Sequence, residues 1–296
     1  MLLQRRRLGR IGWRASIVTL GGCGLGELSQ KKADEAVKIA LRYGVNTVDV
    51  APSYGQAELR LASCLRRYRK RLFVAEKTME RSKKRAWAEL RRSLRRLEVN
   101  NFDLYQLHAV GGLQELKTSL GKDGAIQAIQ EAKETGLVNH IGITGHKDMR
   151  VLKRAIERFD FDSVLLPVNL ASMTNPTPEN DFRPILKEAN QRDMAVIAIK
   201  AIAKSRWKPG KKKYSTWYEP IDIERQVLEA VSFTLSQAPV ATYSLPCDIR
   251  LWPLVLNAAM KYKELDKIEQ KKAIEHAREA GFKPLFPTRK REYSAE

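Results

Sequence analysis

Short apolar segments and longer amphipathic segments alternate along this chain with a regularity that few folds can accommodate. The short segments are mainly apolar, and none is hydrophobic on one side only, as a strand in a sheet with one solvated face would be. Strands of this kind are buried on both faces, which predicts a parallel sheet covered by helices. Eight strand–helix units within 296 residues favour an α/β fold of the closed (β/α)8 TIM-barrel type over an open doubly wound sheet. The expected strands are 17–22, 46–50, 72–77, 102–108, 140–144, 163–169, 195–200 and 241–245.

The barrel is expected to occupy residues 1–282 as a single domain. Gly9 and Gly12 are turn signals in an extended basic segment, which predicts a short hairpin at 1–13. The tail 283–296 is expected to be poorly ordered. The expected helices are 30–43, 56–69, 83–97, 124–135, 148–158, 178–192, 223–237 and 250–262, with an extra C-terminal helix at 265–280.

The chain is strongly basic, with a formal net charge of +20. A basic surface can attract nucleic acid or another polyanion. Lysine and arginine on the outward faces of helices explain the same composition without any partner. Because no known nucleic-acid motif occurs in the sequence, the second interpretation is favoured and nucleic acid is not an expected partner.

The three cysteines are Cys23, Cys64 and Cys247, far apart and odd in number. No CxxC occurs, so the sequence carries no zinc or iron–sulfur signature. These residues are expected to be reduced thiols in a cytoplasmic protein. No apolar run has the length of a signal peptide's core or of a membrane span, so membrane association is not expected.

Polar side chains stand at the ends of three successive expected strands. Asp49 ends the second strand, and Tyr54 follows it in a turn; Lys77 ends the third strand and His108 the fourth. Taken singly, these could be a cap, a loop aromatic, a solvated charge and a core histidine. Together they predict a catalytic group, because active sites of (β/α)8 barrels lie at the carboxyl ends of the strands.

The motifs around these residues resemble those of the aldo-keto reductases, over nearly the whole chain. The resemblance rests on Asp49-x4-Tyr54 and on the block Leu90-Arg-Arg-Ser-Leu-Arg-Arg-Leu97 followed by Asp103-Leu-Tyr-Gln-Leu-His108. It implies reduction of an aldehyde or ketone with hydride from NAD(P)H. Tyr54 would donate the proton, its pKa lowered by Lys77. Asp49 would hold the lysine, and His108 would orient the carbonyl group.

The same resemblance implies a cofactor site, with NADP expected and NAD as the alternative. One branch of the family, which often carries a C-terminal iron–sulfur domain, shares the histidine of Ile141-Gly-Ile-Thr-Gly-His146 and the segment Ile197-Ala-Ile-Lys200; the iron–sulfur cysteines are absent here. Arg250 could pair with a 2′-phosphate or be a surface arginine. The residues expected to bind the cofactor are Thr144, His146, Asn169, Lys200, Arg250 and Asn257.

Some cofactor positions depart from the family pattern, notably Gly145, Leu165 and Cys247. These departures motivate an alternative: a redox sensor or regulatory subunit that binds the cofactor but turns over little. A small carbonyl compound is the expected partner. Its identity depends on loops such as 203–219, whose conformation the sequence does not specify.

Overall fold

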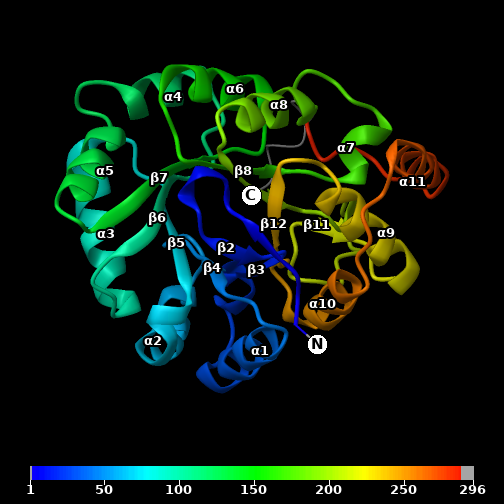
Figure 1. The fold of residues 1–296 in the computed structure, drawn as a ribbon, viewed down its shortest axis with the longest axis horizontal. Coiled ribbons are helices and arrows are strands. Elements are labelled where there is room, and N and C mark those ends of the chain that lie inside the picture. Colours follow the sequence, from blue (N-terminus) through cyan, green and yellow to red (C-terminus); the bar gives the residue numbers. More distant parts are fainter. Residues whose placement is uncertain (1, 288–296) are drawn as a thin grey trace.

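The computed structural model describes residues 2–287 and shows a closed barrel of eight parallel strands in the order β12-β3-β4-β5-β6-β7-β8-β9, ringed by helices (Figure 1). The predicted (β/α)8 TIM barrel is therefore confirmed. Each strand is buried along nearly its whole length, as the continuous apolar segments required. The strands are β3 (Val18–Gly21), β4 (Thr47–Asp49), β5 (Phe73–Thr78), β6 (Phe102–Leu107), β7 (Val138–Thr144), β8 (Ser163–Pro167), β9 (Ala195–Ile199) and β12 (Val240–Ser244).

The helices bury an apolar stripe against the barrel and expose their charged residues. In α3, Leu90 and Leu97 are buried while Arg91 and Arg95 are exposed. Two helices were not predicted, α4 and the short α7. The helices are α1 (Gln30–Arg42), α2 (Ala57–Tyr68), α3 (Lys83–Leu97), α4 (Leu113–Leu120), α5 (Ala125–Glu134), α6 (Met149–Arg158), α7 (Leu170–Thr174), α8 (Arg183–Gln191), α9 (Glu224–Leu235), α10 (Trp252–Met260) and α11 (Lys267–Glu279).

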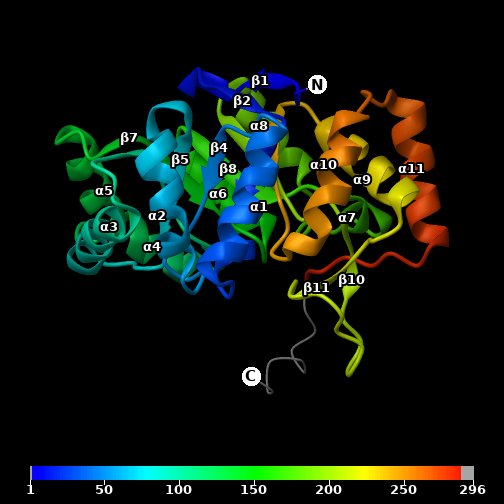
Figure 2. The same ribbon diagram turned by 90° about the horizontal axis from the view of Figure 1, so that it is seen from below.

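An antiparallel hairpin of β1 (Arg5–Arg7) and β2 (Arg14–Ser16) covers one end of the barrel (Figure 2). Its Leu8 is fully buried against barrel residues. Gly9 has a φ of +47°, and a Cβ there would lie 2.4 Å from the backbone nitrogen of Ala195, so glycine is required for this close approach. The Arg6 guanidinium donates to the carbonyl oxygens of Leu235 at 2.6 Å and Val240 at 2.9 Å.

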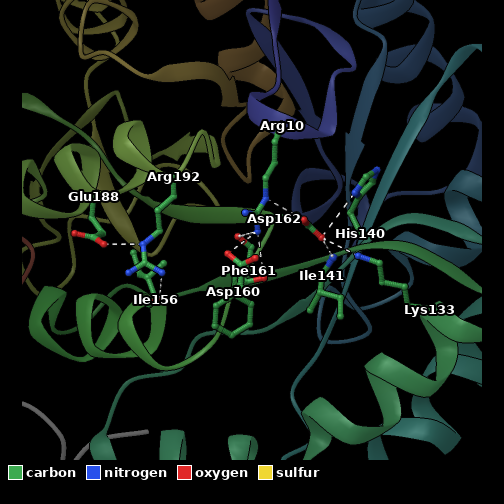
Figure 3. Close-up of polar contacts among 10 residues, drawn as sticks. All are labelled: Arg10, Lys133, His140, Ile141, Ile156, Asp160, Phe161, Asp162, Glu188 and Arg192. Atoms are coloured by element: carbon green, nitrogen blue, oxygen red, sulfur yellow. Dashed lines mark hydrogen bonds and ion pairs between the residues drawn. The ribbon is translucent and has the colours of Figure 1, made fainter.

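Polar contacts fix the tip of this hairpin to the loop before β8 (Figure 3). Arg10 lies 3.2 Å from a carboxylate oxygen of Asp162 and 2.9 Å from Asp160. Asp162 also accepts a hydrogen bond from the backbone of Ile141 at 2.9 Å. Burial alone would raise the pKa of Asp162, but hydrogen bonds from His140 and Ile141 outweigh it and lower the pKa. Asp162 is therefore charged at neutral pH and anchors the hairpin.

A second antiparallel hairpin, β10 (Ala203–Arg206) and β11 (Tyr218–Pro220), projects from the opposite end of the barrel (Figure 2). The chain after α11 runs back along it, with the Lys283 nitrogen donating to the Lys204 oxygen at 2.9 Å. Leu285, at the start of the tail that the sequence predicts, is buried against Ala203 and Tyr218 of this hairpin. Residues 288–296 of that expected tail lie outside the described part of the chain.

Cys23 and Cys247 form a disulfide, so the expectation of reduced thiols was wrong for these two residues. Cys23 lies just after β3, and Cys247 lies just after β12. These strands are neighbours in the closed barrel, which brings their loops together although 224 residues separate the cysteines in sequence. Cys64 is free and buried, and burial raises the pKa of its thiol to about 11.

Between residues 2 and 287, none of the helices combines the length and the apolar character that crossing a membrane would demand.

Candidate active site

The four residues expected to be catalytic converge at the carboxyl ends of β4, β5 and β6. Asp49 is the last residue of β4, Lys77 is in β5, and His108 directly follows β6. The turn after β4 carries Tyr54 back over Lys77. The parallel pairing of β4 with β5 and of β5 with β6 places these side chains at one end of the barrel.

Lys77 and Asp49 form a buried ion pair at the centre of this group. The Lys77 Nζ lies 2.7 Å from Asp49 Oδ1 and donates to the carbonyl oxygen of Val50 at 3.0 Å. Burial alone would lower the pKa of Lys77, but the charge of Asp49 outweighs it and the pKa is raised. The lysine is therefore a fixed cation, and losing either partner would leave the other charge buried, which typically costs about 3–5 kcal/mol.

Tyr54 lies between this cation and His108. Its ring centroid is 5.0 Å from the Lys77 Nζ and 5.6 Å from the His108 ring, which meets it edge to face. Burial raises the pKa of Tyr54 more than Lys77 lowers it, so the net shift is upward, opposite to the expected one. The phenol is consequently protonated at neutral pH, as a proton donor must be.

His108 is an uncharged imidazole. Only 6% of the residue is exposed, and its Nδ1 has no hydrogen-bond partner among residues 2–287. Burial, together with the nearby charges of Lys77 and Arg81, lowers the pKa of His108 well below its usual value. A neutral histidine with one N–H can donate a hydrogen bond to a carbonyl oxygen without competing for the proton.

Four of the residues expected to bind a cofactor lie at the ends of β7, β8 and β9, beside the residues expected to be catalytic. Thr144 accepts a hydrogen bond from the Ala109 nitrogen at 2.7 Å and so fixes the loop after His108. Asn169 caps α7 through its Oδ1, while its buried Nδ2 has no partner among the described residues. His146 and Lys200 contact each other, with 3.2 Å between Nδ1 and Nζ.

Arg250 and Asn257 lie apart from this group, after β12. Arg250 is paired with Asp248, 2.6 Å from its Oδ2, and stacks on the Tyr214 ring at 4.9 Å. Asn257 is exposed on α10 and accepts a hydrogen bond from the Tyr43 hydroxyl at 2.6 Å. A cofactor reaching both ends would have to extend from β7–β9 across to α10.

Three further residues border the site that sequence reasoning did not select. Gln106 donates to Asp49 at 3.4 Å, and its position two residues before His108 in a strand could have indicated a shared face. Trp217, from the projecting hairpin, packs against Phe286 at 5.6 Å between ring centroids. The sequence pointed to the loop 203–219 as a determinant of specificity, but it gave no reason to select Trp217 within that loop or Phe286 in the C-terminal segment.

Glu76, next to Lys77 in β5, is a buried carboxyl group whose protonation can be tested. The residue is fully buried, its Oε2 has no partner among residues 2–287, and burial together with Glu58 raises its pKa well above 4.5. A carboxyl group whose folded-state pKa is raised contributes stability at low pH that is lost as pH rises through that pKa. Glu76→Gln should therefore gain stability relative to wild type as pH rises above 4.5.

Urea unfolding at several pH values checks this expectation, with Glu264→Gln, an exposed glutamate, as the matched control. Parallel stability curves for wild type and Glu76→Gln would show that Glu76 does not hold its proton in the folded protein.

Comparison with known proteins points to one family. A sequence model of the Aldo/keto reductase family matches residues 17–277. YqkF of Bacillus subtilis, described as an oxidoreductase, is 27% identical over 216 residues, which cover 68% of this chain and 66% of the relative. The aldo-keto reductase YhdN from the same organism is 24% identical over 63% of this chain and 54% of its own length. The chain thus spans between about half and two-thirds of the length of these curated relatives.

Solved structures show the same fold. The aldo-keto reductase AKR11C1 from Bacillus halodurans in its holo form superposes with a TM-score of 0.71 at 21% identity, covering 98% of this chain and 100% of the other. The thermostable aldo-keto reductase Tm1743, solved with the inhibitor epalrestat, gives a TM-score of 0.70 at 19% identity, covering 92% of this chain and 99% of the other. At such identities the likeness supports the barrel architecture alone.

Proposed function

Because this chain belongs to the aldo/keto reductase family, we propose that it is an oxidoreductase that reduces aldehyde or ketone carbonyls at the site formed by Asp49, Tyr54, Lys77 and His108. The observation that carries the proposal is the buried Lys77–Asp49 ion pair against a protonated Tyr54. A structural ion pair would not require a tyrosine and an uncharged histidine at its edge.

Each side chain has a distinct role in this proposal. Tyr54 donates its proton to the carbonyl oxygen as negative charge develops there. Lys77 stabilises the phenolate that remains, and Asp49 keeps the lysine charged and in place. His108, uncharged, donates a hydrogen bond that orients the carbonyl group.

The residues at β7–β9 fit a nicotinamide cofactor, which would supply the hydride. The buried Nδ2 of Asn169, which has no partner among residues 2–287, is a donor suited to a carboxamide oxygen. Thr144 and His146 lie at the end of the neighbouring strand. We assign the adenine end to Asn257 and a 2′-phosphate to Arg250, whose guanidinium would then be shared with Asp248. This assignment favours NADP, with NAD as the alternative.

Titration with NADPH and NADH, followed by fluorescence, tests the proposal. We expect saturable binding of at least one dinucleotide, tighter for NADPH because of Arg250, and a fall in absorbance at 340 nm when a reactive aldehyde is added. Heat-denatured protein is the control. Absence of binding by either dinucleotide would overturn the proposal.

A second function is favoured by the disulfide between Cys23 and Cys247, which joins loops at the ends of β3 and β12. A cofactor-binding redox sensor with little turnover would use such a pair. It predicts dinucleotide binding without oxidation by any aldehyde, together with a change in affinity when the disulfide is reduced.

A further inference from the structure

Lys200 is a buried lysine at the active site for which the described part of the chain supplies no acidic partner. It directly follows β9, only 8% of the residue is exposed, and its φ of +62° turns the backbone into the left-handed region. Its contacts are the Nδ1 of His146 at 3.2 Å and the Trp217 ring, whose centroid is 5.2 Å from Nζ. A buried ammonium group paired only with an imidazole and an aromatic ring lacks a counter-ion.

The groups around Lys200 are basic or neutral. His146, on the loop after β7, has its pKa lowered well below the usual value by burial and by Lys200, and is therefore uncharged. Beyond it, 6.4 Å away between ring centroids, lies the uncharged His108. Lys77 is charged, and the Asp49 carboxylate is engaged by that lysine. A positive site without a free carboxylate therefore borders the expected position of the substrate.

The contact with Lys200 also determines which nitrogen of His146 carries the proton. A charged Lys200 can only donate, so in that state the His146 Nδ1 accepts and the imidazole proton lies on Nε2. An anion that contacts the Lys200 Nζ would receive a charged hydrogen-bond donor. Burial lowers the pKa of Lys200 to about 7, and an anionic ligand would raise it again by favouring the charged form.

We propose that Lys200, oriented by His146 and Trp217, binds a carboxylate of the substrate, so that the preferred substrates are aldehydes or ketones that also carry a carboxylate group. The geometry favours the substrate over a cofactor phosphate, because Lys200 contacts His146, whose ring lies 6.4 Å from that of His108, while Arg250 follows β12. The inference rests on the proposed function and adds a substrate class to it.

The test compares 4-carboxybenzaldehyde with its uncharged methyl ester, methyl 4-formylbenzoate, in wild type and Lys200→Met. At pH 6.5 wild type should prefer the acid by at least tenfold in kcat/KM, and the variant should lose that preference, mainly through a higher KM. Lys38→Met, at an exposed lysine on the outer face of α1, removes the same charge and should keep the preference.

A pH profile of the wild-type enzyme gives a readout that does not depend on the variant. Between pH 6 and pH 9 the KM for the acid should rise as Lys200 loses its proton, while the KM for the ester stays flat. Equal kcat/KM values for acid and ester in wild type would overturn the inference and leave the proposed function standing.

A Lys200→Met variant that weakens NADPH binding, with unchanged preference between acid and ester, would also overturn the inference and return Lys200 to the cofactor. Reduction of neither aldehyde would overturn the proposed function itself. These outcomes are distinct, so failure of the substrate class can be told apart from failure of the reaction.

Discussion

Tyr54→Phe is expected to lower kcat/KM for aldehyde reduction by about 10²–10⁴-fold, the range that a positioned proton donor contributes. Phenylalanine preserves the ring that meets His108 edge to face and lies over Lys77, but it has no proton to give. The dissociation constant for NADPH should change little. Steady-state kinetics and fluorescence titration on the same preparation measure both quantities.

Tyr68→Phe is the matched control, because this partly buried tyrosine at the end of α2 lies outside the site. The upward shift in the pKa of Tyr54 adds a second expectation. The wild-type rate should show no loss of this proton across the neutral range. An undiminished rate in Tyr54→Phe would remove Tyr54 from the mechanism.

The second large effect is expected from Cys23→Ser. The disulfide closes a loop of 224 residues, and chain-entropy arguments for long loops give about 4–5 kcal/mol of stabilisation as an upper value. Without reductant, the variant should have a free energy of unfolding lower by about 3–5 kcal/mol than wild type. Urea unfolding with and without reductant measures this difference.

The reductant provides the internal comparison, since reduced wild type should resemble Cys23→Ser. Cys64→Ser is the control variant, because Cys64 is free and buried, and its replacement should leave the response to reductant intact. Three titratable thiols in denatured wild-type protein prepared without reductant would show that the disulfide does not form.

The barrel could be predicted because the strands are short, mainly apolar segments. The convergence of the four residues proposed as catalytic could be predicted because strand ends meet at one end of a barrel. The sequence mispredicted helices where local features favoured two different structures. The segment Leu113–Leu120 forms α4, but glycines on both sides favoured a loop, and α8 begins at Arg183 rather than at 178.

The features that the sequence did not predict depend on which distant segments the closed barrel brings together. Cys23 and Cys247 meet only because β12 pairs with β3, and the residues around each cysteine do not indicate this pairing. The pKa of Tyr54 depends on how deeply the folded chain buries it, and that burial outweighs Lys77. Trp217 reaches Lys200 only because the insertion forms the β10–β11 hairpin.

The hairpin at the amino terminus has a consequence for how the protein is made. It is synthesised before most of the barrel, and its arginines bind partners that are synthesised much later. Asp162, the partner of Arg10, follows it by 152 positions in the chain, and Val240, the partner of Arg6, follows it by 234 positions. The hairpin therefore cannot be fixed over its end of the nascent barrel until the chain up to Val240 has been synthesised. A chaperone that shields apolar surface would be needed most during that interval.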